Sequence, residues 1–234
     1  EQTEQLGTGH AVLQALPALG QASTVLVLYG DVPLVSGPVL QALVAAAHDA
    51  PALLTASLTD PSGYGRVLRD DNGAFRAVVE HKDASPAELA VTEVNTGILA
   101  APAHLLQRYL PQVGNRNQQR EYYLPDVLSL AVAEGLVVHT VSAGNPLEVM
   151  GVNDQLQLSR LEREVQRQRA EALMLAGVRL ADPARLDVRG SLRCGRDVFI
   201  DVNCVFIGDV VLGDGVRVGP NCVVADSQGG AGSE

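Results

Sequence analysis

The sequence has no tryptophan, and aromatic residues make up only 3% of its 234 residues. A hydrophobic core must therefore be built mainly from aliphatic Val, Leu and Ala side chains. Apolar residues make up 47% of the chain and charged residues 19%, which is enough to bury a sizeable core. This composition excludes a chain that is disordered throughout.

Cysteine is also scarce, and long apolar runs are missing. The three cysteines, Cys194, Cys204 and Cys222, form no CxxC pair, which excludes a disulfide framework. No run of about 18 apolar residues exists, so we expect no transmembrane helix. No signal peptide is recognisable, and both ends look cut. We therefore expect a cytoplasmic protein.

Positive charge is in deficit, because 17 Lys and Arg residues face 27 Asp and Glu residues, a formal net charge of −10. Bulk electrostatics of this sign oppose binding to a nucleic-acid duplex or an anionic membrane, and we expect neither as a partner. Nucleotides are still possible ligands, because backbone amides and a metal ion can bind phosphate on an acidic protein.

The first 150 residues alternate between strand-like and helix-like segments. Short apolar runs typical of buried strands lie at 23–29, 52–58, 97–100 and 136–141, and Asp71-Asn72-Gly73 indicates a hairpin. Helical patterns lie at 10–19, 36–47, 103–110 and 124–133. Such alternation predicts an α/β fold, a Rossmann-like layered domain with a mostly parallel sheet.

The last third of the sequence has a different rhythm. A long helix is predicted over 154–176, with Leu158, Leu161 and Val165 on its apolar face and Gly177 as its C-cap, and it is expected to link two domains. Apolar residues then recur every six positions in two series: Val188, Cys194, Ile200, Phe206, Leu212, Val218 and Val224, and Leu192, Val198, Cys204, Val210, Val216 and Cys222. This repeat is typical of a parallel β-helix whose coil has three faces and about 18 residues.

The repeat explains the cysteines as small buried apolar residues, since all three fall on inward positions. Metal binding and catalysis are the alternatives. About two coils are present, whereas solenoids usually need about three repeats and a cap. We therefore expect the β-helix to need partner chains or further coils.

Several polar segments could carry chemistry, and each has a simpler reading. Asp31 follows a predicted strand in Tyr29-Gly30-Asp31, where it could bind Mg²⁺ or merely cap the next element. The small residues Gly7 and Thr8 precede a helix, which suits an anion or a base edge but equally suits a plain turn. His10 is expected to be a surface or packing residue.

The remaining candidate residues likewise allow a functional and a purely structural interpretation. Glu80 lies in a charged turn that could be a solvated loop. Asn95 could bind a sugar hydroxyl or form an Asx turn. Asn153 or Asp154 is expected to cap the long helix, with a ligand role as the alternative.

Taken in order, seven motifs resemble one family. They are Gln2-x-x-Gln5-Leu-Gly-Thr-Gly-His-Ala11, Leu28-Tyr-Gly-Asp-Val-Pro33, Asp60-Pro-Ser-Gly-Tyr-Gly-Arg66, Val79-Glu-His-Lys-Asp-Ala84, Val94-Asn-Thr-Gly-Ile98, Glu121-Tyr-Tyr123 and Gly151-Val-Asn153. The chain resembles the bifunctional N-acetylglucosamine-1-phosphate uridyltransferase / glucosamine-1-phosphate acetyltransferase family (GlmU) of bacterial cell-wall synthesis, nearly from end to end.

This resemblance implies a fold and a reaction. The expected parts are a partial nucleotidyltransferase domain over 1–153, a linker helix over 154–177, a truncated left-handed β-helix over 178–227 and a flexible tail over 228–234. The expected reaction transfers uridylyl from UTP to N-acetylglucosamine 1-phosphate, giving UDP-N-acetylglucosamine and pyrophosphate. The parent would also acetylate glucosamine 1-phosphate with acetyl-CoA, for peptidoglycan and lipopolysaccharide precursors, and would form a homotrimer through its β-helix.

The resemblance also implies roles for individual residues. Asp31 and Asn153 would hold Mg²⁺. The uracil and sugar contacts would come from Gln2, Gly7, Thr8, Tyr29, Gly30, Gly65, Glu80 and Asn95.

Some family features have no counterpart in this sequence. The Gly-rich phosphate loop with its basic residue and a later Lys is missing, and so are the acetyltransferase residues of later coils. The resemblance therefore implies a chain that is defective in both reactions. Arg120 and Pro125 replace a usual Gly and Thr, and Arg120 leaves a sugar contact in doubt. The alternatives are another sugar-nucleotide pyrophosphorylase and a non-catalytic trimerising fragment.

Overall fold

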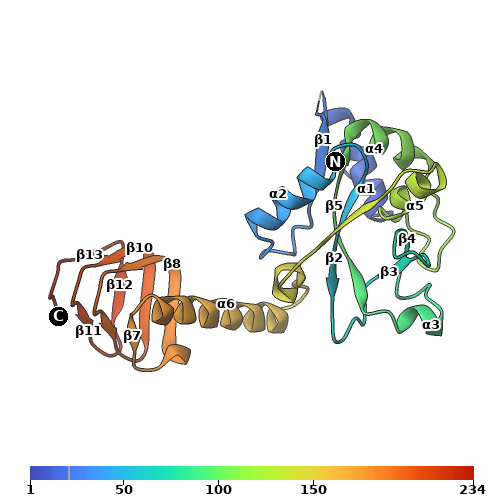
Figure 1. Ribbon diagram of the computed structural model, residues 1–234. Coiled ribbons are helices and arrows are strands. Elements are labelled where there is room, and N and C mark those ends of the chain that lie inside the picture. The colour runs from blue at the N-terminus through green and yellow to red at the C-terminus, as the bar shows by residue number, and fades with distance from the viewer. Residues whose placement is uncertain (21) are drawn as a thin grey trace. The chain divides into compact units, whose positions relative to one another are not determined.

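A computed structural model describes residues 1–20 and 22–234 (Figure 1). The chain forms two compact units, Glu1–Gly151 and Val152–Glu234. None of the helices in these described residues combines the length and the apolar character that crossing a membrane requires.

The first unit is built on a six-stranded sheet. Its path runs β4-β3-β5-β2-β6, and β1 pairs with the remaining length of β5. The strands are β1 (Thr24–Val27), β2 (Ala52–Ser57), β3 (Arg66–Arg69), β4 (Phe75–Val79), β5 (Glu93–Pro102) and β6 (His139–Ser142). The predicted strands and the hairpin at Asp71-Asn72-Gly73 are thus present, with β6 starting three residues later than expected.

The prediction of a mostly parallel sheet is confirmed for strand direction and corrected for pairing. β1, β2, β3 and β6 point the same way, whereas β4 and β5 run against them. Because β5 lies between strands of the majority direction, β2 and β6 are the one parallel pair among the described strands of this sheet. β1 is only half-buried, since β5 is its one described neighbour.

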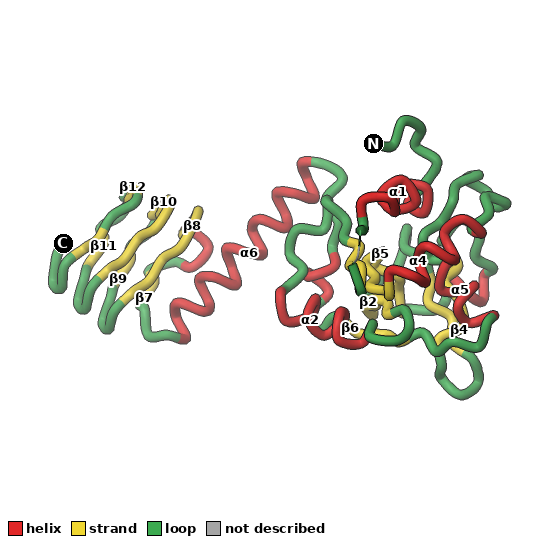
Figure 2. Tube along the Cα trace, turned by 90° about the horizontal axis from the view of Figure 1, so that it is seen from above, coloured by secondary structure: helices red, strands yellow, loops and turns green. Residues whose placement is uncertain are grey.

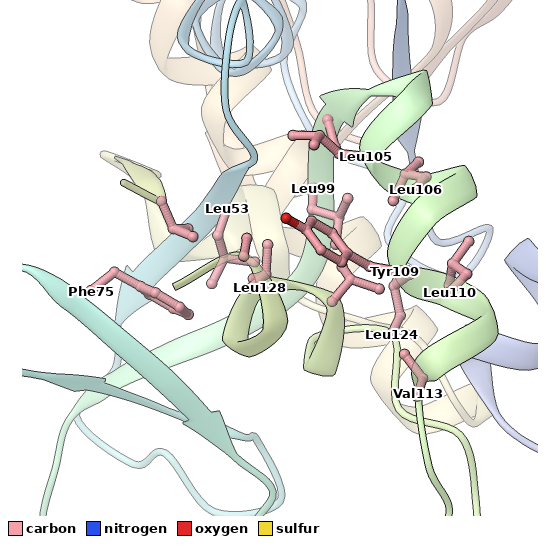
Figure 3. Close-up of a cluster of buried hydrophobic side chains, with 14 of the residues drawn as sticks. Leu53, Phe75, Leu99, Leu105, Leu106, Tyr109, Leu110, Val113, Leu124 and Leu128 are labelled. Atoms are coloured by element: carbon pink, nitrogen blue, oxygen red, sulfur yellow. The ribbon is translucent and has the colours of Figure 1, made fainter. Parts of the chain in front are cut away.

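Both faces of this sheet are covered, as expected for a layered α/β domain. Alternate residues of a strand point to opposite faces, and Leu53 and Leu99 accordingly join one apolar cluster while Leu54 and Ile98 join another. The first cluster includes Tyr109 of α4 (Ala103–Tyr109) and Leu128 of α5 (Asp126–Ala133), and Figure 3 shows these side chains packed together. Side chains of α1 (Thr8–Ala15) pack on the same cluster.

The second face is covered by α2 (Gly37–Ala46), whose Leu43 is fully buried. Ser36 occupies the N-cap position and Pro38 lies in the first turn, as the sequence indicated. A short helix that the sequence analysis did not predict, α3 (Pro86–Leu89), is closed by a capping box between Ser85 and Glu88.

The second unit begins with the long helix α6 (Gln155–Leu175), capped by the Asp154 side chain, which accepts from the Gln157 N–H at 2.7 Å. The prediction that Leu158 and Leu161 lie on a buried apolar face is only partly correct, because Leu161 is buried but Leu158 is 45% exposed. Gln166, a polar residue of the same helix, is only 4% exposed and is hydrogen-bonded to β8 (Leu186–Cys194). Its side chain accepts from the Val188 N–H at 2.8 Å and donates to the Val188 carbonyl at 2.9 Å.

Beyond α6 the chain winds into parallel coils (Figure 2). β8, β10 (Cys204–Leu212) and β12 (Val223–Ala225) stack on one another, as do β7 (Arg179–Leu180), β9 (Phe199–Ile200) and β11 (Arg217–Val218). Cys204 pairs with Leu186 and Arg217 with Phe199, so the register is the predicted 18 residues.

The hexapeptide pattern is confirmed in the core of this unit. All thirteen residues of the two predicted series belong to a single apolar cluster, including the three free cysteines. The predicted flexible tail needs a correction, because Gln228–Gly229 form a strand, β13, beside Val211 and Leu212.

Candidate functional site

Tyr29 comes to lie on Gly97 because of the antiparallel register of β1 and β5. Val27 stands opposite Leu99, and continuing the pairing by two residues brings position 29 level with position 97. Gly97 has a φ of 80°, and a side-chain carbon there would lie 2.8 Å from the Tyr29 hydroxyl oxygen and overlap its ring.

The Tyr29 phenol also connects several other predicted residues. The Thr8 side chain and the carboxylates of Glu80 and Asp31 are near enough to influence its hydroxyl. Burial raises the pKa of Tyr29, the Thr8 side chain opposes that rise, and the two carboxylates add to it.

The segment that precedes α1 is held against the loop before α5. The Gly9 N–H donates to the Tyr122 carbonyl at 2.8 Å, and the Leu124 N–H donates to Thr8 Oγ1 at 3.1 Å. Gly7, with a φ of 105°, has no room for a side chain, because a Cβ would lie 2.8 Å from the Tyr122 carbonyl oxygen. The segment Gly7–Gly9 is therefore not a plain exposed turn, because it packs against residues 122–124.

Gln2 joins the same region from the N-terminal side. Its Nε2 donates to the Gly7 carbonyl at 3.3 Å and lies 3.0 Å from His10 Nδ1. The ring of His10 stands 6.2 Å from that of Tyr122. These contacts give His10 the packing role that the sequence analysis expected.

Gly65, Glu80 and Asn95 converge although they come from three strands or strand ends. The Asn95 N–H donates to the Gly65 carbonyl at 2.8 Å, and the Asn95 side chain is near enough to the Glu80 carboxylate to lower its pKa. Glu80 Oε1 lies 3.0 Å from where a Cβ on Gly65 would be. The Asn95 Oδ1 also accepts from the Gly97 N–H at 2.9 Å, so the expected Asx-type bond is formed as well.

Glu80 is not part of a merely solvated loop. Asp83, three residues on, accepts from the Gln118 N–H at 3.0 Å and lies 3.4 Å from the Tyr123 hydroxyl. Burial raises the pKa of Glu80, and the charges of Asp126 and Asp83 raise it further. Burial and then Asp83 raise the pKa of Asp126 to about 6.

None of these three carboxylates forms a salt bridge within residues 1–20 and 22–234. A region of this charge suits neutral hydrogen-bond donors such as sugar hydroxyls and amides. It is unsuited to a bare phosphate, which would need backbone amides or a cation.

Asp31 is one of the two residues predicted to bind such a cation. Its side chain is exposed, and no hydrogen bond or ion pair of its carboxylate is found among the described residues. Gly151 is a neighbour of this carboxylate, since a Cβ on Gly151 would lie 3.7 Å from Asp31 Oδ2, an ordinary van der Waals contact. An exposed, unpartnered carboxylate oxygen fits Mg²⁺, which usually takes one or two protein ligands beside phosphate oxygens and water.

The second predicted metal ligand, Asn153, belongs to the other unit. It is exposed, its backbone N–H donates to Gln157 Oε1 at 2.7 Å, and Asp154 rather than Asn153 caps α6. Its relation to Asp31 therefore stays a prediction. No group of three or more His, Cys, Asp or Glu side chains in the described part of the chain is arranged to hold a metal ion.

Two residues of this region escaped the sequence analysis. Gly97 was quoted within the Asn-Thr-Gly motif, but its positive φ and its contact with Tyr29 are visible only in the structure. Asp126 had no signal beyond its place at the start of a helix. Gly30 differs from both, since a Cβ there would meet open space. Packing therefore does not require glycine at position 30.

Comparisons with known proteins agree with the motifs. The family model described as bacterial transferase hexapeptide (six repeats) matches residues 192–226. Proteins named bifunctional protein GlmU are similar over 99% of this chain. They include those of Burkholderia vietnamiensis (55% identical, 51% of its length covered), Methylibium petroleiphilum (56%, 51%) and Azoarcus sp. (58%, 52%).

The chain thus spans about half the length of the curated relatives that it matches. The resemblance predicted from seven motifs is confirmed over nearly the whole of this sequence. Over nearly its whole length, the sequence is similar to about half of each of these proteins named bifunctional protein GlmU.

Proposed function

We propose that the first unit binds UDP-N-acetylglucosamine and serves uridylyl transfer from UTP to N-acetylglucosamine 1-phosphate. The observation that carries this proposal is the meeting of Thr8, Tyr29, Gly65, Glu80 and Asn95 in one region of the unit. These are the positions that the GlmU-like motifs assign to the sugar nucleotide. The similarity to proteins named bifunctional protein GlmU supports the same function.

The chemistry expected of the site is positioning rather than covalent catalysis. A phosphate oxygen of the sugar phosphate attacks the α-phosphorus of UTP, the bond between the α- and β-phosphates breaks, and pyrophosphate leaves. The Glu80 carboxylate and the Asn95 amide would hold the amino sugar through its hydroxyl and amide groups. Gln2 and the Gly7–Thr8 segment would hold the uracil side.

Mg²⁺ is the proposed cofactor, with the Asp31 carboxylate and the Asn153 carboxamide as its protein ligands. When bound, it would neutralise phosphate charge next to the sugar nucleotide. Asp31 supplies a hard oxygen on an exposed side chain.

Calorimetric titration of the chain with UDP-N-acetylglucosamine, with and without Mg²⁺, tests this proposal. We expect saturable binding that weakens at least tenfold in the variant Glu80→Gln, because a neutral amide at that position is a poorer acceptor. Asp71→Asn, which makes the same change of carboxylate to carboxamide on an exposed hairpin residue, serves as the control. No binding at millimolar ligand would contradict the proposal, and tighter binding of an ADP- or dTDP-sugar would favour a different pyrophosphorylase.

Turnover is a separate question. The motifs missing from this sequence predict no UTP-dependent release of pyrophosphate at saturating substrates. Release at a steady enzymatic rate would contradict that prediction and would leave the binding proposal intact.

For the second unit the proposed role is assembly into a homotrimer. The supporting observations are the hexapeptide match and the parallel coils. Light scattering on a gel-filtration column should give three times the 24.6 kDa chain mass. A monomer would contradict assembly by the part of the β-helix present in this sequence.

A further inference from the structure

We propose that Gly97 is a positioning residue for the sugar-nucleotide site, because it forms the seat on which the Tyr29 ring is held. The identity of the ligand rests on the proposed function. The seat, meaning the contact between the Tyr29 ring and Gly97, lies within the first unit and does not depend on the ligand. No motif role was assigned to Gly97.

Tyr29 is confined on two sides. On one side its ring lies across the bare Cα of Gly97, at the place that any side chain on position 97 would take. On the other side its hydroxyl lies close to the Thr8 side chain. Thr8 is itself held by the Leu124 N–H, which donates to Thr8 Oγ1 at 3.1 Å.

This arrangement matters because Tyr29 follows β1 in an otherwise open stretch. Its neighbours Leu28 and Gly30 are exposed, and Gly30 has open space around it. Without the seat, the ring would have no packing surface at Gly97 and would keep only its approach to Thr8. A side chain with several rotamers would then have to be ordered by the ligand, at a cost in affinity.

Gly97 also links Tyr29 to the other end of the site. Its N–H donates to Asn95 Oδ1 at 2.9 Å, and the Asn95 side chain in turn lies close to Glu80. A change at Gly97 therefore reaches two groups proposed to contact the sugar. The effect through Tyr29 can be isolated, because it depends on the ring.

A double-mutant cycle with Gly97→Ala and Tyr29→Ala separates the two routes. We expect each single variant to weaken UDP-N-acetylglucosamine binding about tenfold. The double variant should lose less affinity than the two single losses added together, since the contact between Gly97 and the ring is already lost in either single variant. Gly135→Ala is the matched control, because Gly135 has a φ of 82° and no atom near its would-be Cβ.

NMR of the chain with labelled tyrosine and glycine provides a readout that needs no ligand. In the parent chain the Gly97 Hα protons should be shifted by the Tyr29 ring current, and Tyr29→Leu should abolish that shift. In Gly97→Ala the Tyr29 ring signals should move toward solvent-exposed values.

Two results would overturn the proposal. One is a pair of binding losses that add fully in the double variant, and the other is a Gly97 signal unchanged by Tyr29→Leu. If Gly97→Ala does not fold, Tyr29→Leu still decides the matter. Failure of the parent chain to bind the sugar nucleotide would overturn the proposed function, whereas the ring-current shift would still report the seat.

Discussion

Glu80 occupies the space that a side chain on Gly65 would need: its Oε1 lies 3.0 Å from the would-be Cβ of Gly65. The two residues are neighbours because β3 and β4 form a hairpin that pairs Arg66 with Val79. A small residue at position 65 therefore lets a half-buried carboxylate stay beside Asn95.

Gly65→Ala should accordingly displace Glu80. The alanine Cβ would also press on Val78 Cγ1 at 3.1 Å, and the flexible carboxylate is the group that can give way. We expect UDP-N-acetylglucosamine to bind about tenfold more weakly, as measured by calorimetry. Gly114→Ala should bind normally, since nothing lies within 4 Å of its would-be Cβ. Equal affinities for all three proteins would contradict this prediction.

Asp126 should make the first unit less stable as the pH rises. Its pKa is about 6 in the folded chain against an ordinary value of about 4, so the folded state holds a proton that the unfolded state has already lost. The stabilising contribution is full below pH 4 and is lost as the pH rises through 6. At pH 7 Asp126→Asn should unfold at a higher urea concentration than the parent, by roughly 1 kcal/mol after solvent screening, and the difference should vanish near pH 4.

Tyrosine fluorescence reports this transition selectively, because all five tyrosines lie in the first unit. Glu88→Gln is an informative control of opposite sign. The Ser85 backbone and side chain hold the pKa of Glu88 below its ordinary value. Removing that carboxylate should lower the urea midpoint at pH 7 and have no effect at low pH. A pH-independent gain in Asp126→Asn would disprove the electrostatic explanation.

Arg120→Gly should stabilise the loop before α5. Arg120 has a φ of 57°, in the left-handed region where a Cβ is strained and glycine is not. This is the position at which the family motif usually has Gly. We expect a gain of about 0.5–1 kcal/mol in urea unfolding followed by tyrosine fluorescence. Arg116→Gly, in the same loop but at a negative φ, should give no gain.

Gln166→Leu should loosen α6 from the β-helix. Gln166 satisfies both the N–H and the carbonyl of Val188, and Arg169 can still reach that carbonyl. The Val188 N–H is left without a partner, at a cost of about 1–2 kcal/mol. The rate of hydrogen exchange at the Val188 amide should rise by the factor that corresponds to this loss of free energy. Gln168→Leu, which alters an exposed side chain on the same helix, should leave that exchange rate unchanged.

The cysteines should behave as core residues toward alkylating reagents. Burial raises the pKa of Cys194 to about 11, and burial likewise raises the pKa of Cys204. At pH 8 only about one Cys194 thiol in a thousand is ionised, so iodoacetamide should modify it far more slowly than in urea. Mass spectrometry of timed samples measures this. Equal rates in the folded and unfolded chains would point to an exposed, reactive thiol instead.

The prediction of the fold succeeded where the determining pattern is local. The six-residue repeat set the coil length and the inward side chains, because each corner of a β-helix is specified by a few consecutive residues. Strand and helix positions followed from apolar runs and caps in the same way. The direction of pairing could not follow, since β5 enters the sheet between strands that are distant from it in sequence.

Candidate site residues could be named from motif order, but their mutual contacts could not. The sequence by itself determined the period of the β-helix, the aliphatic core and the set of polar segments in which the chain resembles GlmU. Only the tertiary structure decided that Tyr29 rests on Gly97, that Asp126 influences Glu80 and that Gln166 binds the edge of β8. Each of these contacts joins residues more than 20 positions apart, and such pairs are fixed by chain packing rather than by any local preference.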